Sequence, residues 1–203
     1  MTDDAASPAD RLEPTTERAA ERRLERITFD YSATEDRLLA RMQASDGERQ
    51  AAWLTQRLAR RLVKALLSHL EKAIVAECSG SGKLDTTSTG TAGQSPKAML
   101  MSFRHQAAQL KRNASPAVAP IETRDLPLLE AIHARLSYNR AALTMELPGG
   151  PAVLSLSHDH AWQLLQILLN IFRKADWPVD VWPDWMRDQD DAGTLSGDTQ
   201  VLH

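Results

Sequence analysis

The pattern of hydrophobic and polar positions predicts the same series of elements twice along the chain. In the first series, residues 26–32 and 37–44 alternate as half-buried strands do, and residues 50–54 form a short third strand. Ser45-Asp46-Gly47-Glu48 favours a turn before the third strand, because Gly adopts a positive φ at no cost. At Thr55 the spacing changes to that of an amphipathic helix.

The second series begins near residue 128. Residues 132–138 alternate as a strand, although the segment 129–135 also fits a helix. Two further strands are predicted at 141–147 and 152–156, separated by the turn residues Pro148-Gly149-Gly150-Pro151. Ser157 is placed to cap a helix that runs to about Lys174. The sequence therefore predicts an α+β fold of two tandem strand-meander-plus-helix units.

The two units match at a spacing of 102 residues, which indicates an internal duplication and a pseudo-twofold arrangement. Leu54-Thr55 falls on Leu156-Ser157, and the following helices share Leu and Ala positions. The second helix has no charged residue between Ala161 and Phe172, which is typical of a buried helix. We expect it to pack against the first helix, with Leu62 facing Leu168, or against another subunit of a homo-oligomer.

Composition divides the chain into five segments. These are an acidic N-terminal segment at 1–25, a first unit at 26–77, a linker at 78–127 with a short helix at 96–111, a second unit at 128–175 and an acidic tail at 176–203. Residues 78–95 are rich in Gly, Ser and Thr and bury little, so we expect a flexible linker there. Its GSGK at 80–83 lacks the remaining residues of a phosphate-binding loop.

Charge is distributed unevenly along the chain. The body at 26–175 holds 19 Lys and Arg against 13 Asp and Glu, whereas the tail at 176–203 holds one Arg against seven Asp. The tail also contains Trp177, Trp182 and Trp185. Because purely solubilising tails are poor in aromatic residues, these three are predicted to bind a partner.

The most informative charged feature is a basic stripe at the start of the first helix. Arg57, Arg60, Arg61 and Lys64 share one helix face, and no acidic residue lies between Gln50 and Leu70. Cations near a helix N-terminus are unfavourable for the helix dipole. The stripe is either a solvated face or an anion-binding site, and the anion could be nucleic acid, an acidic protein partner or the chain's own tail.

Other chemistry is not indicated. His158-Asp159-His160 reads as the polar first turn of a helix rather than a metal site, and Cys78 has no adjacent base to activate it. We therefore expect no enzyme, no cofactor and no metal. No apolar run is long enough to span a membrane, and one cysteine suits a reducing, cytoplasmic environment.

The segment AVLSLSHDHAWQLLQILLNIF at 152–172 resembles the final strand and helix of the transcriptional positive cofactor family. The strand–strand–strand–helix order in tandem is similar to the single-stranded-DNA-binding fold of that family, the Whirly proteins and the purine-rich-element-binding proteins. The resemblance implies binding of single-stranded nucleic acid. Phosphates would lie along the basic stripe and bases would stack on Phe29, Tyr31 or Tyr138. The alternative is a protein-interaction adaptor that docks through the tail and the helix at 96–111.

Overall fold

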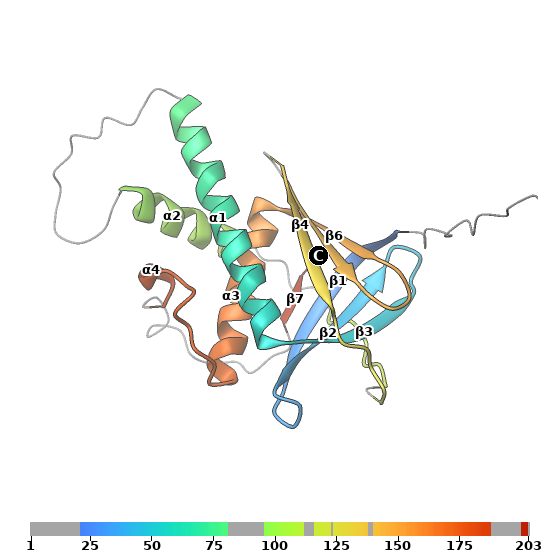
Figure 1. Cartoon of the computed structure of the whole chain (residues 1–203). Helices are drawn as coiled ribbons and strands as arrows, with labels where there is room; N and C mark the ends of the chain where they lie inside the picture. The colour runs from blue at the N-terminus through green and yellow to red at the C-terminus, as the bar shows by residue number, and fades with distance from the viewer. Residues whose placement is uncertain are drawn as a thin grey trace, which may run out of the picture.

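The computed structural model describes residues 21–80, 96–111, 116–122, 124–137, 140–187 and 200–202 (Figure 1). The first unit contains strands β1 (Arg22–Ser32), β2 (Arg37–Ala44) and β3 (Arg49–Leu54) and helix α1 (Gln56–Gly80). Helix α2 (Pro96–Leu110) lies between the units in sequence. The second unit contains β4 (Ala131–Leu136), β5 (Arg140–Glu146), β6 (Ala152–Ser157) and α3 (His158–Lys174), followed by α4 (Asp184–Arg187) and β7 (Gln200–Leu202).

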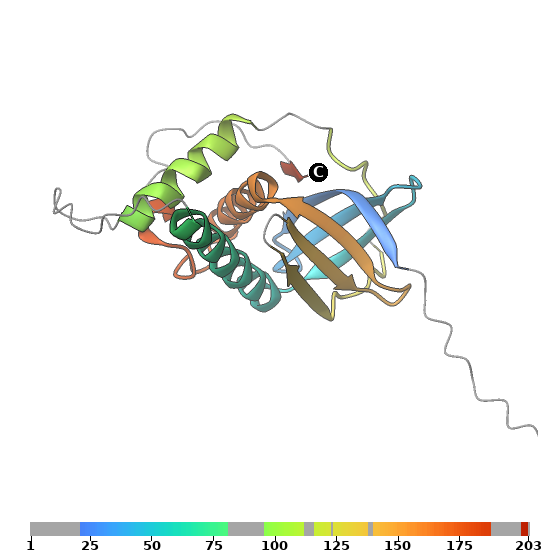
Figure 2. The same ribbon diagram turned by 90° about the horizontal axis from the view of Figure 1, so that it is seen from above.

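The strands form one curled mixed sheet in the order β3-β2-β1-β6-β5-β4 (Figure 2). Within each unit neighbouring strands are antiparallel, whereas β1 and β6 pair in parallel at the junction between the units. A parallel bridge between Trp53 and Leu128 also links the two outer edges of the sheet. There the Trp53 amide donates to the carbonyl of Pro127 at 2.8 Å. The predicted α+β class is confirmed.

The predicted turns and cap explain where several elements begin and end. Gly47 adopts a φ of 87° between β2 and β3, a conformation that costs glycine least. Ser157 caps α3, and its hydroxyl accepts a hydrogen bond from the His160 amide at 3.2 Å. Asp36 completes the β1–β2 turn at a φ of 47°, which Asp tolerates better than most residues.

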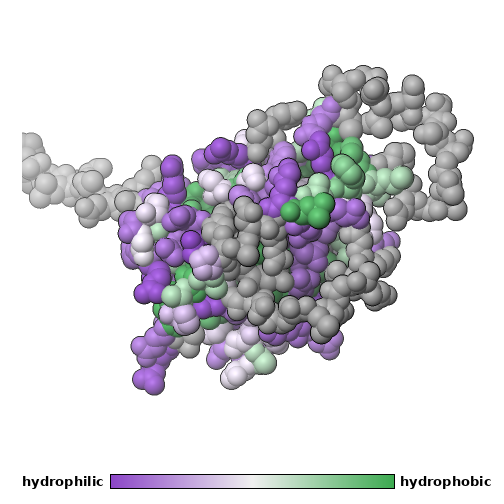
Figure 3. Space-filling model, turned by 180° about the vertical axis from the view of Figure 1, so that it is seen from behind, coloured by the Kyte–Doolittle hydropathy of each residue, from purple (hydrophilic) through white to green (hydrophobic). Residues whose placement is uncertain are grey.

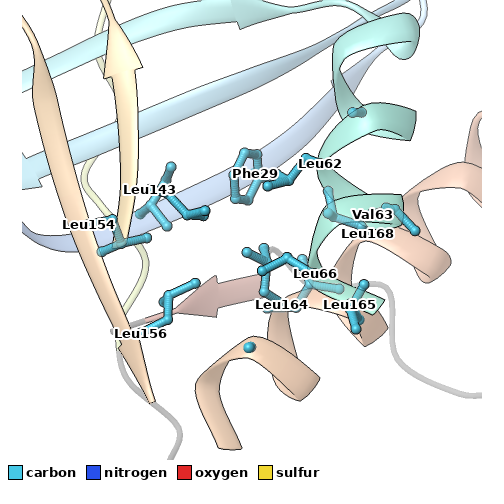
Figure 4. Close-up of a cluster of buried hydrophobic side chains, with 14 of the residues drawn as sticks. Phe29, Leu62, Val63, Leu66, Leu143, Leu154, Leu156, Leu164, Leu165 and Leu168 are labelled. Carbon is cyan, nitrogen blue, oxygen red and sulfur yellow. The ribbon is translucent and has the colours of Figure 1, made fainter. Parts of the chain in front are cut away.

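Helices α1 and α3 pack side by side on one face of the sheet and close the hydrophobic core (Figure 4). Strand residues such as Phe29, Leu143 and Leu154 point from the sheet toward the leucines of both helices. Leu62 is 4% exposed and Leu168 is fully buried, as the periodicity predicted. No helix in the described part of the chain is long and apolar enough to cross a membrane.

Several boundaries differ from the prediction. Strand β1 begins at Arg22, and α1 continues through Gly80, so the first three residues of the expected linker are helical. The rest of that linker, 81–95, lies outside the described residues. The alternative helix at 129–135 is wrong, because Ala131–Leu136 pairs with β5 as a strand. Helix α4 and strand β7 were not predicted, and both lie in the tail.

Candidate anion-binding face

The basic stripe lies on the outer surface of α1. One side of the helix is buried in the core, namely Ala59, Leu62, Val63 and Leu66. Arg57, Arg61 and Lys64 lie on the opposite side and are exposed. These three cations have no ion pair within the described residues. Lys72 is exposed two turns further along the same face. Lys72 is not among the predicted residues, although its spacing of eight residues from Lys64 places it on the same side of the helix.

Arg60 differs from the other members of the stripe because it already binds a carboxylate. Its two terminal nitrogens each donate to one oxygen of Asp180 at 2.7 Å, a bidentate geometry, and Nη1 also donates to the Pro178 carbonyl at 3.1 Å. These hydrogen bonds hold the pKa of Asp180 below its ordinary value, and the charge of Lys64 acts in the same direction. The chain's own tail is therefore one of the anions on this face.

The residues on either side of Asp180 are fixed by aromatic packing. Trp177 is 7% exposed and packs edge-on against Phe172 and Tyr31, with ring centroids 5.0 and 5.6 Å away. Its indole nitrogen donates to Asp36 Oδ1 at 2.8 Å. Trp182 also packs edge-on against Phe172, with ring centroids 4.6 Å apart. The segment 177–182 is thus a rigid bracket that presents Asp180 to Arg60.

The third tail tryptophan is also part of the core. Trp185 in α4 contacts Trp162 of α3 and His105 of α2, with ring centroids 6.0 and 5.7 Å apart. All three tryptophans are less than a tenth exposed. These tryptophans, which the sequence predicted to bind a partner, instead pack against Phe172, Trp162 and His105 of this chain. Trp177, Trp182 and Trp185 are not a free surface for a partner.

The predicted stacking residues are not brought together on an open surface. Phe29 is 5% exposed and packs in the core, so a base could not stack on it without disrupting that packing. Tyr31 is half-buried against Trp177 and its hydroxyl donates to Asp36 Oδ1 at 3.0 Å, which raises its pKa. Tyr138 lies outside the described residues. The structure places only Tyr31 near the bracket that carries Asp180.

A second polar cluster lies where the end of α1 meets α2 and the start of α3. The rings of His69 and His158 are 5.4 Å apart, and the Nε2 atom of each is buried without a hydrogen-bond partner. A small hollow beside them is bordered by Glu77 and Arg104, which form an ion pair at 2.7 Å. No group of three or more potential metal ligands occurs among the described residues.

The chain was compared with protein-family models, curated proteins and solved structures. No protein-family model matches the sequence, and the comparisons with curated proteins and with solved structures found no match. The resemblance to the Whirly and transcriptional positive cofactor families stays a prediction from the residues at 152–172.

Proposed function

We propose that the protein is a non-catalytic binding protein whose exposed face of α1 binds single-stranded nucleic acid through its phosphates. The observation that carries the proposal is the row of exposed cations at Arg57, Arg61 and Lys64, none of which forms an ion pair within the described residues. The row follows a rigid helix that is anchored by Leu62 and Leu66 in the core. A fixed row of cations suits a repeating phosphate backbone.

The bracket around Asp180 supports an oxyanion as the ligand of this face. A carboxylate already binds Arg60 in the bidentate geometry that a phosphate also adopts. Burial of Phe29 and the packing of Tyr31 remove most of the expected base stacking. Binding should therefore depend on phosphate contacts, so it should be tolerant of sequence and sensitive to salt.

Fluorescence anisotropy with a labelled poly(dT) oligonucleotide tests the proposal between about 50 and 200 mM salt. Neutralisation of three phosphates on a single strand corresponds to a slope of about −2 in the plot of log affinity against log salt. The triple variant Arg57→Glu, Arg61→Glu, Lys64→Glu should lose most of the affinity and flatten this slope. All three side chains are exposed, so the variant should keep its melting temperature.

A matched control reverses three exposed arginines on the strands, namely Arg23, Arg49 and Arg140. It changes the net charge by the same amount and leaves α1 intact. Equal losses in the two triple variants would contradict a site on α1, because they would indicate only the overall charge. Absence of binding by the unaltered protein at about 50 mM salt, where electrostatic binding is strong, would contradict the nucleic-acid proposal itself.

A second candidate function, a protein-interaction adaptor, is favoured by α2. Its inner face is buried through Met101, His105 and Ala108, but its outer face leaves Met99, Phe103 and Leu110 at 62, 66 and 90% exposed. Figure 3 shows hydrophobic residues gathered on the helical side of the molecule. The expected partner is a protein with an apolar helix face. If Phe103→Glu abolished partner capture while poly(dT) binding was absent, the adaptor function would replace the first proposal.

We also infer that the two units arose by duplication and are related by a pseudo-twofold axis. At one parallel junction the first strand of the first unit, β1, pairs with the third strand of the second unit, β6. At the other, Trp53 in the third strand of the first unit pairs with Leu128, just before the first strand of the second unit. Exchanging the two units would therefore exchange the two junctions. Burial supports the 102-residue spacing as well. Ala59 and Ala161 are both fully buried, as are Leu66 and Leu168.

A further inference from the structure

Strand β1 has one edge that its neighbour in the sheet covers only in part. On one side β1 pairs with β2 from Leu24 to Ser32. On the other side β6 pairs with it only at Arg22–Leu24, and β6 then runs on to Ser157, where α3 begins. Beyond Leu24, this side of β1 therefore has backbone groups that β6 does not reach.

The C-terminal strand β7 occupies part of this edge. It runs antiparallel to β1, with Leu202, Val201 and Gln200 opposite Ile27, Thr28 and Phe29. It also contacts α3. Figure 4 shows β7 as the faint red arrow that passes between Leu156 of the sheet and Leu164 of α3. β7 therefore contacts both β1 of the sheet and α3.

We propose that the edge of β1 from Ile27 to Ser32 is a docking site for an extended segment of a partner protein, and that β7 is its resting occupant. An uncovered strand edge is a template for strand addition, because its N–H and C=O groups need partners. β7 covers three of these six residues. In the described part of the chain, Asp30, Tyr31 and Ser32 pair with β2 alone.

The register indicates the chemistry of the partner. Ile27 and Phe29 are at most 5% exposed, so residues opposite them face the core. A partner strand should therefore carry apolar side chains at alternate positions. Continuing the register of β7 would set Asp198 and Gly197 of this chain opposite Tyr31 and Ser32. Asp and Gly are poor strand formers, so a partner with β-branched residues at these positions would form a longer and stronger pairing.

Competition between the two strands makes the site displaceable. β7 belongs to the same chain, so its pairing with β1 is intramolecular and has an effective concentration advantage over a free peptide. A strand of three residues contributes few hydrogen bonds, so the tether supplies much of its occupancy. A partner strand that covers all six residues gains pairs that β7 lacks. This site is independent of the basic face on α1.

A labelled synthetic peptide of residues 194–203 tests the proposal by fluorescence anisotropy. The chain shortened to residues 1–187 should bind the peptide. The full chain should bind it with an affinity lower by a factor of roughly ten or more, because β7 already fills the site. The peptide with Asp198→Val and Gly197→Thr should bind more tightly than the natural one. The peptide with Val201→Pro should not bind, since proline removes an N–H and disfavours the interior of a pairing strand.

A second arrangement keeps the test decisive if the shortened chain does not fold. A protease site placed within 188–199 of the full chain is cut after folding, and exchange of the released strand for the labelled peptide is measured. Equal binding to cut and intact protein would overturn the proposal, as would no binding by a cut protein that still melts cooperatively. The proposal would also be overturned if the full chain formed dimers that the natural peptide dissociates, because the edge of β1 would then bind a second copy of the chain.

Discussion

Helices α1 and α3 occupy the same place in their units, but their surroundings differ. Each follows a third strand, and their buried leucines match at a spacing of 102 residues. At the same spacing, however, Arg60 corresponds to Trp162 and Arg61 to Gln163. Gln163 is 8% exposed, whereas its counterpart Arg61 is exposed to solvent. A position that is surface on one helix is core on the other.

The difference arises from what covers each helix. Helix α2 lies over α3, where the Gln163 amide nitrogen donates to the Ala108 carbonyl at 2.9 Å in a buried contact. Lys111 at the end of α2 pairs with Asp159 at 2.9 Å, and Trp185 from the tail packs on Trp162. On α1 the bracket forms an ion pair with Arg60 through Asp180 at 2.7 Å. The inserted helix and the tail thus bury this face of α3, whereas Arg57, Arg61 and Lys64 of α1 stay exposed.

The largest expected effect is at the shared core of the two helices. Leu168→Asp should unfold the protein, because an unpaired charge would be buried at a site with no exposure, and a loss above about 4 kcal/mol is a large part of a typical stability. Leu62→Asp should act in the same direction. Chemical denaturation followed by circular dichroism measures both.

Ser68→Asp is the matched control, since it places the same residue at an exposed position of α1. It should change stability by no more than about 0.5 kcal/mol. A Leu168→Asp protein as stable as the control would contradict the packing of α3 against the sheet and α1.

A smaller effect is expected at His69, whose counterpart at the 102-residue spacing is Ile171; both residues are 7% exposed. Burial lowers the pKa of His69 from its ordinary value of 6.5, and the charges of His158 and Lys72 lower it further. The unfolded chain therefore binds a proton below about pH 6.5 that the folded protein resists, so stability should fall as the pH drops through this range.

His69→Leu tests this assignment, because it removes both the titration and the buried Nε2 atom that has no partner. The variant should be at least as stable as the unaltered protein at pH 7, and its stability should fall less between about pH 6.5 and 5. Melting temperatures across this range measure the difference. Identical pH profiles for the two proteins would show that His69 does not titrate on unfolding as proposed.

Much of the fold could be predicted from the sequence, because local period and turn chemistry decide it. The limits of β2 and the capped start of α3 follow directly from alternation, Gly47 and Ser157. The face of β1 could also have been assigned, since a period of two puts Phe29 on the same side as the buried Ile27. That rule alone argued against base stacking on Phe29.

The tail could not be predicted in the same way. Trp177, Trp182 and Trp185 follow neither a strand nor a helix period, and their burial depends on a surface built by Phe172 and Trp162. The ion pair between Arg60 and Asp180 joins residues 120 positions apart, for which no local pattern exists. Strand β7 has only three residues and depends on the free edge of β1.

The smallest expected effect is at the bracket that distinguishes the two helices. Asp180→Asn should leave the melting temperature within about 2 °C, because an exposed ion pair contributes little to stability. It should nevertheless tighten binding of poly(dT), since Arg60 would be released to join Arg57 and Arg61.

Asp176→Asn is the matched control, because it removes the same charge from an exposed residue of the tail. Asp176 forms no ion pair among the described residues. A larger gain for Asp180→Asn than for Asp176→Asn would assign the effect to Arg60. Equal gains would mean that only the overall charge of the tail matters, and the bracket would then be a structural contact of α1 like those that cover α3.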